Sequence, residues 1–135
     1  MTRRRKAREM ALQTLYAVEL SGEDSEKVLK DNAVRRRSAG EPVNYARELI
    51  ASVSSEKKMI DSLIESNLKN WKLERLALID LIILRIAIAE LIYFKSIPKN
   101  VIINEAIEIA HKFSSGKAGK FVNGILDKVS GEVRK

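Results

Sequence analysis

The 135-residue sequence has no cysteine, a single histidine, two prolines and few aromatic residues. Without cysteine the chain forms neither disulfides nor thiolate metal sites, and its composition is compatible with a reducing cytoplasm. His111, with no nearby cluster of carboxylates, cannot build a usual zinc site, so we expect it to pack on a helix or lie at the surface. The low proline and aromatic content favours helices over a sandwich of short strands.

Motifs of secretion and catalysis are also missing. The apolar stretch after the basic start is interrupted by Gln13 and Glu19, and no small-residue cleavage site follows, so we interpret it as part of the mature domain. No nucleophile elbow or histidine–carboxylate spacing is present. Gly116, Gly119 and Gly124 match neither the Walker loop nor the dinucleotide fingerprint. We therefore predict a cytoplasmic protein that is not an enzyme and uses no cofactor or metal.

The longest hydrophobic run is 76–94, which is interrupted only by Asp80, Arg85 and Glu90. At about 100° per residue these charges fall on three different sides of a helix. A membrane span needs ~20 apolar residues, and three ionisable groups costing roughly 2.5 to 3.5 kcal/mol each near the bilayer centre argue against one. We therefore expect a central helix surrounded by others, in which Arg85 pairs with an Asp or Glu.

The rest of the chain shows the apolar spacing of amphipathic helices. Thr2 is expected to cap the first helix and Gly22 to end it. We expect the SSGKAG segment to be a loop before the last helix, and 31–42 to be a mobile connection between two helical halves. The sequence thus predicts an all-α fold in a single domain, 1–135, with approximate subdomains 1–70 and 71–135.

The net charge of +7 favours a polyanionic partner, either nucleic acid or a membrane surface. Five cations stand within six positions at the start of the first helix, where the helix dipole opposes them; these are Arg3, Arg4, Arg5, Lys6 and Arg8. Such a cluster can neutralise several phosphates, while the alternative is a solvated tail that only aids solubility. A helix-turn-helix would need an exposed recognition helix, whereas these helices look committed to packing.

Aromatic rings accompany the cations. Tyr16 lies two turns or more beyond the basic start, and Lys117, Lys120 and Phe121 stand near the start of the last helix. Cations beside exposed rings suit single-stranded nucleic acid, whose bases stack on aromatic side chains. Simple burial of both rings is the alternative interpretation.

Two acidic residues precede or begin the central helix. Glu74 and Asp80 are favoured there by the helix dipole, which explains them without any function. The alternative is an acidic patch for a basic protein partner.

Four segments of the sequence resemble the bacterial NusB family of transcription antitermination factors: RRRKAREMALQTLY, WKLERL with ILRIAIAEL, INEAIEIAHKF and GKFVNGILDK. The resemblance covers essentially the whole chain. It implies about seven helices in two small bundles around the central hydrophobic helix. It also implies binding of the boxA element of nascent ribosomal RNA together with NusE, a small-subunit ribosomal protein, and indirect contact with RNA polymerase and other antitermination factors.

The resemblance also assigns residues. By motif, Arg4, Arg5, Lys6 and Arg8 match the family's RNA-binding start, and Lys120 and Phe121 are further RNA contacts. Tyr16, Glu74 and Asp80 fall where the family meets NusE. Relatives often carry acidic residues before KFVNG, so Lys117 in SSGKAG is expected to strengthen RNA binding here and to change the dependence on NusE.

Two alternatives stay open at the sequence level. One is the NusB-like domain of ribosomal RNA methyltransferases, which falls away if the gene product ends at Lys135. The other is a helical adaptor that binds protein through Glu74 and Asp80 and shows no specific RNA binding. Self-association over the RNA or partner surface is also left open.

Overall fold

The computed structural model describes residues 3–69 and 72–134, in which the chain forms seven α-helices and one short 3-10 helix. In order they are α1 (Arg3–Ser21), α2 (Ser25–Arg35), α3 (Glu41–Ser55), α4 (Lys57–Glu65), the 3-10 helix η1 (Leu73–Arg75), α5 (Leu78–Tyr93), α6 (Lys99–Phe113) and α7 (Gly116–Val133). The predicted all-α fold class is confirmed. The expected cap Thr2 lies outside the described residues.

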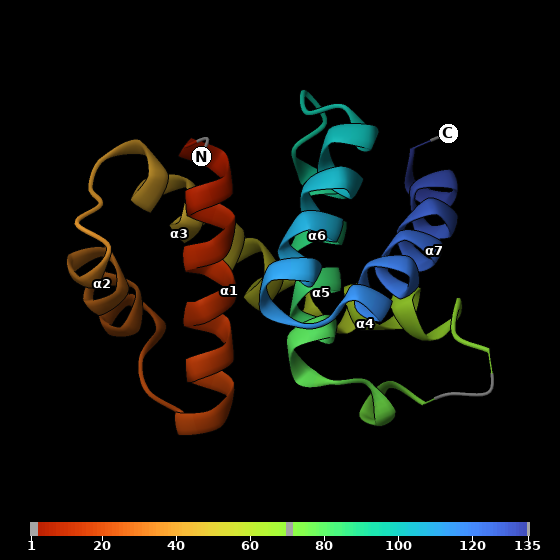
Figure 1. Cartoon of the computed structure of the whole chain (residues 1–135), viewed down its shortest axis with the longest axis horizontal. Helices are drawn as coiled ribbons and strands as arrows, with labels where there is room; N and C mark the ends of the chain where they lie inside the picture. The colour runs from red at the N-terminus through yellow and green to blue at the C-terminus, as the bar shows by residue number, and fades with distance from the viewer. Residues whose placement is uncertain (1–2, 70–71, 135) are drawn as a thin grey trace.

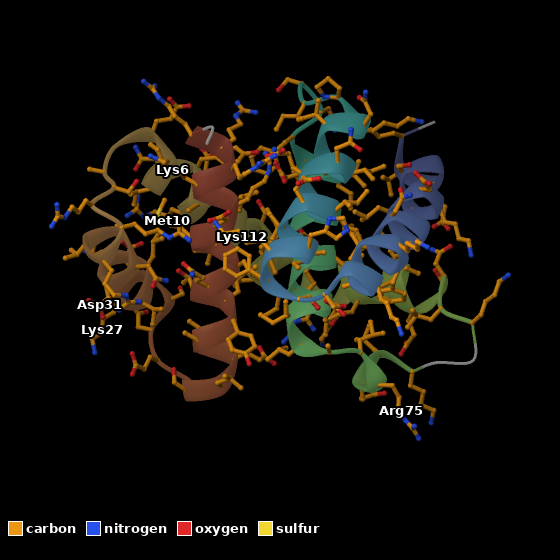
Figure 2. All side chains as sticks on the ribbon, viewed as in Figure 1. Lys6, Met10, Lys27, Asp31, Arg75 and Lys112 are labelled. Carbon is orange, nitrogen blue, oxygen red and sulfur yellow. The ribbon has the colours of Figure 1, made fainter. Side chains whose placement is uncertain are left out.

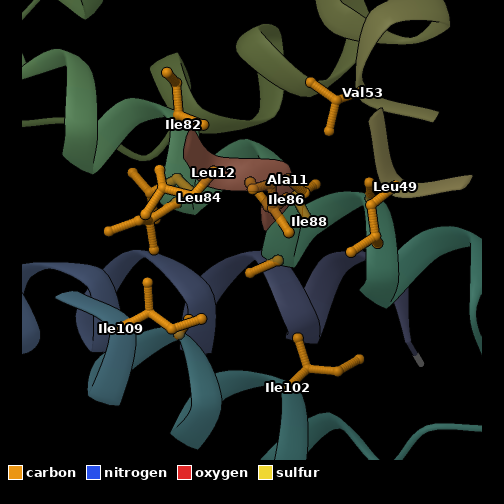
Figure 3. Packing of buried hydrophobic residues seen from close by; sticks show 14 of the residues in the cluster. Ala11, Leu12, Leu49, Val53, Ile82, Leu84, Ile86, Ile88, Ile102 and Ile109 are labelled. Atoms are coloured by element: carbon orange, nitrogen blue, oxygen red, sulfur yellow. The ribbon is translucent and has the colours of Figure 1, made fainter. Parts of the chain in front are cut away.

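Helix α5 occupies the middle of the molecule. Every residue from Leu81 to Leu91 is buried, and α5 contacts α1, α3, α4, α6 and α7. Figure 1 shows α1, α2 and α3 to one side of it and α7 to the other. The hydrophobic cluster joins α5 to residues of several helices, among them Ala11, Leu49 and Ile102 (Figure 3). None of the described helices combines the length and apolarity that a bilayer crossing requires.

The charges inside α5 have different environments. Arg85 donates to both carboxylate oxygens of Asp61 on α4, at 2.8 and 2.9 Å, so the acidic partner expected for it is present. Glu90 is 1% exposed and accepts from Arg8 of α1. Asp80 has a buried carboxylate oxygen, Oδ1, for which the described residues offer no hydrogen-bond partner. Paired charges therefore tie α1 and α4 to the central helix, because breaking a buried pair is costly.

The connection between α2 and α3 is shorter than expected. Residues 31–35 continue α2 and residues 41–42 begin α3, so only 36–40 lie outside a helix. Asp24 caps the start of α2 by accepting from the Lys27 amide, and Gly22 ends α1 with a φ of 72°. The turn also closes the end of α2 with two backbone hydrogen bonds, Ser38 N to Ala33 O at 2.9 Å and Arg37 N to Val34 O at 3.1 Å. The prediction of a mobile connection over 31–42 is wrong for its helical parts.

The proposed subdomains, 1–70 and 71–135, meet in one hydrophobic cluster. Helices α1, α2 and α3 pack on one another, as do α5, α6 and α7. Helix α4 precedes residue 70 and contacts α3 and α7, but it packs most extensively against α5. The packing therefore favours a division between α3 and α4, and the boundary at residue 70 stays a proposal.

Candidate nucleic-acid interface

Three of the five cations at the start of α1 face outward. Arg3 is exposed and lies 3.3 Å from Glu41 of α3. Arg4 lies over the Tyr45 ring, 4.8 Å from its centroid. Lys6 is exposed and has no acidic partner in the part of the chain that the structure describes. These side chains, which we call the outer cations, present positive charge to solvent on a helix that packs against α2, α3 and α5.

The other two cations face inward. Arg8 is 4% exposed; its Nε and Nη2 donate to Glu90 at 2.8 Å each, and its Nη1 lies 3.4 Å from Glu105. Arg5 makes a two-pronged contact with Glu105 of α6, with its Nε 3.0 Å from Oε1 and its Nη2 bonded to Oε2. Tyr45 completes the buried group by donating its hydroxyl to Glu90 at 2.6 Å. A direct RNA contact by Arg8 is therefore not supported by this structure.

The pKa shifts follow from these contacts. The hydrogen bond from Arg5 lowers the pKa of Glu105. Burial disfavours the charged form of Arg8, but its hydrogen bonds to Glu90 raise its pKa overall. Burial, followed by the charge of Glu90, raises the pKa of the Tyr45 hydroxyl. Arg8 therefore remains charged and Tyr45 a neutral donor at neutral pH.

The second predicted group lies at the start of α7. Ser115 caps this helix by accepting from the Ala118 amide, so Gly116 to Gly119 of SSGKAG are helical, and the prediction of a loop over that whole segment is wrong. Lys117 and Lys120 are exposed, whereas Phe121 is half-buried. The free amides of the first turn add positive potential beside these lysines.

Close packing positions this helix start against α6. A Cβ added to Gly119 would lie 2.3 Å from Nε2 of His111, so a glycine leaves room for the imidazole. His111 thus packs beside a helix while remaining exposed, which agrees with the role expected from the sequence. The contact holds the end of α6 against the first turn of α7.

Lys112 lies between the two basic groups and was missed in the sequence. Its Nζ lies 3.1 Å from both carboxylate oxygens of Glu9 on α1, and its side chain is 51% exposed. Helix α6 runs from the first basic group toward the second. Glu105, which binds Arg5, and Phe113, the last residue of α6, are eight residues apart, which is about 12 Å along a helix. Figure 2 shows Lys112 at the junction of α6 and α1. The only sequence signal was a cation in the last turn of a helix, where the dipole favours it anyway.

The residues predicted to meet a protein partner lie apart from the outer cations. Glu74 is exposed in η1, Asp80 stands in the first turn of α5, and Tyr16 is half-buried against the core. Asp80 and Phe121 line one open surface hollow, together with Arg75. Phe121, which is expected to contact RNA, and Asp80, which is expected to contact a protein partner, therefore line the same hollow.

Comparisons with known proteins identify the family to which this sequence and fold are similar. The model of the NusB family matches residues 5–131. The chain is 44% identical to the transcription antitermination protein NusB of Geobacter sp. (strain M21), over 98% of this chain and 97% of that protein. It superposes on a T. maritima NusB structure with a TM-score of 0.89 and 37% identity, covering 98% of this chain and 93% of the other. A crystal structure of antitermination factors NusB and NusE in complex with dsRNA matches with a TM-score of 0.88 and 30% identity, covering 98% of each chain.

Proposed function

The chain belongs to the NusB family, and from this premise we propose that it is a transcription antitermination protein that binds RNA together with NusE. The observation that carries the proposal is that two basic groups are exposed: the outer cations at the start of α1, and Lys117 and Lys120 at the start of α7. These side chains stand on helices fixed to one core, so their spacing is set before RNA arrives.

The proposed RNA surface differs from the sequence assignment at two residues. We propose direct phosphate contacts for Arg3, Arg4, Lys6, Lys117 and Lys120, all of which are exposed. Arg8 acts as a positioning residue, because its guanidinium is buried against Glu90. Arg5 has both roles. It binds Glu105 and so helps to position the start of α1, and its side chain is 33% exposed and can also contact phosphate.

The family resemblance supplies boxA as the RNA element, and we propose a single strand as its form. Phe121 then offers a partly exposed ring for base stacking beside Lys120. The matching solved structure contains dsRNA, so a duplex belongs among the competitors in any test. The exposed lysines act on either form, whereas stacking on Phe121 favours the single strand.

For NusE we propose a surface made of Tyr16, Glu74 and Asp80. Asp80 supports it, because this acid lines an open surface hollow and its Oδ1 has no hydrogen-bond partner among the described residues. We infer that the chain acts by binding and not by catalysis.

Fluorescence anisotropy of labelled RNA tests the proposal. A boxA-like strand, a scrambled strand and a duplex of the boxA-like sequence are titrated with the protein, with and without NusE, at 50 and 200 mM salt. Five phosphate contacts predict a log–log salt slope of about −3.5, or roughly a hundredfold loss of affinity between these salts. A preference for the boxA-like strand that sharpens with NusE supports the proposal. Equal binding of all three RNAs would contradict the proposal and support the interpretation as a basic helical adaptor without specific RNA binding.

The protein-partner surface needs a separate variant. Asp80→Lys is expected to abolish NusE binding while RNA binding is kept, because the outer cations are untouched. Asp127→Lys makes the same charge change at an exposed position of α7 and serves as the control. Calorimetric titration with NusE distinguishes them, and wild-type affinity in Asp80→Lys would remove Asp80 from the proposed surface.

A further inference from the structure

One basic run remains unused by the proposed function. Arg35, Arg36 and Arg37 lie at the end of α2 and in the turn that follows; we call them the α2–α3 basic turn. Arg35 and Arg37 are exposed, whereas the Arg36 side chain is 25% exposed. Among the described residues no acidic side chain pairs with Arg37. The turn therefore presents positive charge that the fold does not neutralise.

Arg36 fixes this turn beside α1. Its Nε donates to Gln13 Oε1 and its Nη2 to Glu9 Oε1, each at 3.1 Å. Glu9 is 1% exposed and is also bound by Lys112, so one carboxylate holds cations from two other parts of the chain. Lys6 stands one turn before Glu9 and Met10, on the side of α1 toward α2 and α3 in Figure 2. The basic turn is thus held beside α1 at Glu9 and Gln13, about one and two helical turns beyond Lys6.

The backbone at Arg37 is unusual for its residue type. The φ of Arg37 is 51°, in the left-handed region. The hydrogen bonds of Ser38 to Ala33 and of Arg37 to Val34 form the helix-ending arrangement in which this position usually carries glycine. Arginine there costs folding free energy that glycine would not. An unfavourable residue with no compensating contact in the fold is typical of a position selected for function.

The helix dipole does not explain why position 37 carries arginine instead of glycine. It favours cations near the end of α2 and so explains Arg35, which stands in the last turn. Arg37 lies beyond the helix, where glycine would close the turn equally well. Val34 is exposed next to the run, but a single exposed apolar side chain does not make a membrane-binding face.

We propose that the α2–α3 basic turn is a second phosphate-binding surface, which continues the path of bound RNA from the start of α1 toward α2. This inference rests on the proposed function, because it extends the RNA surface formed by the outer cations. Arg37 and Arg35 bind successive phosphates beyond those held by Lys6, and Arg36 acts as a positioning residue through Glu9 and Gln13. Only an RNA long enough to pass the start of α1 uses this surface.

The test compares Arg37→Gly with Lys27→Gln in the full chain. Both variants lose one positive charge, but Lys27 lies at the other end of α2, where it pairs with Glu23 (Figure 2). Anisotropy is measured with single-stranded RNAs of two lengths. For the longer strand, Arg37→Gly should lower affinity several-fold and flatten the salt slope by about 0.7 relative to Lys27→Gln. Urea unfolding should show that the same variant is more stable than the unchanged protein, since glycine relieves the strained φ.

The outcomes separate this inference from the function on which it rests. If the unchanged protein shows no salt-dependent RNA binding, the proposed function and the inference are both overturned. If it binds and Arg37→Gly behaves as Lys27→Gln does, only the inference is overturned. Loss of binding to phosphatidylserine vesicles without loss of RNA binding would also overturn it, in favour of a lipid surface. Arg37→Lys, which keeps the charge, should retain most of the affinity for the longer RNA.

Discussion

The first helix brings two kinds of cation together within its first two turns. Arg8 and Arg5 point toward the core and bind Glu90 and Glu105, whereas Arg4 and Lys6 point to solvent. A buried guanidinium stabilises the fold because its removal leaves an unpaired carboxylate, while an exposed one contributes little to stability and remains available to a polyanion. Positive charge in one short segment therefore stabilises the fold on one side and, in the function we propose, binds RNA on the other.

The largest effect is expected at the inner side. Arg8→Met leaves Glu90 buried without its charge partner, so the free energy of unfolding should fall by about 3 to 5 kcal/mol. Urea denaturation measures this change. Adding Glu90→Gln removes the unpaired buried charge and keeps an acceptor for Tyr45, so the double variant should lose less stability than Arg8→Met alone. If Arg8→Met is as stable as the unchanged protein but binds RNA more weakly, Arg8 contacts RNA and does not stabilise the fold.

A smaller effect, on binding only, is expected at the outer side. Replacing Arg4 and Lys6 by glutamine should weaken RNA binding about tenfold at low salt, or ~1.4 kcal/mol, and flatten the salt slope by about 1.4. Stability should change by less than about 1 kcal/mol, mostly from the lost contact of Arg4 with the Tyr45 ring. A control variant with glutamine at the exposed Lys58 and Lys128 loses the same charge elsewhere. Equal weakening in both would show that only net charge matters.

The smallest effect concerns the pH dependence of the partly exposed pair. Arg5 holds the pKa of Glu105 below its ordinary value of 4.5. The resulting stability is therefore present above pH 4.5 and is lost as the pH falls through the lower folded-state pKa. Glu105→Gln should be less stable than the unchanged protein near pH 7 by at most about 1 kcal/mol, after allowance for solvent screening. Urea unfolding should show a smaller difference in stability between Glu105→Gln and the unchanged protein at pH 3 than at pH 7.

A control for the pH experiment is Glu48→Gln, which changes an exposed acid of α3 that has no ion pair among the described residues. Its stability difference from the unchanged protein should be small and should vary little over the same pH range. A gap for Glu105→Gln that stays constant with pH would contradict the assignment of the Arg5 pair as a source of acid sensitivity.

The burial of Arg8 had a signal in the sequence. Leu12 stands one turn after Arg8 and is buried, so Arg8 occupies the edge of the apolar stripe of α1. By contrast, nothing local marked Glu90 as its partner, because the two residues are 82 positions apart. The same limit applies to Lys112 and Glu9, which are separated by 103 positions. Spacing along one helix predicts which side chains turn inward but not what they meet.

The sequence by itself determined the all-α class, the buried central helix and the basic start of the chain, because helical periodicity and charge runs are local properties. Only the tertiary structure decided which carboxylates neutralise Arg5 and Arg8. Their partners come from α5 and α6, and a carboxylate can neutralise a cation only when packing brings the two into contact. We therefore propose that, at the start of α1, RNA binds the cations that the carboxylates of the core leave unpaired.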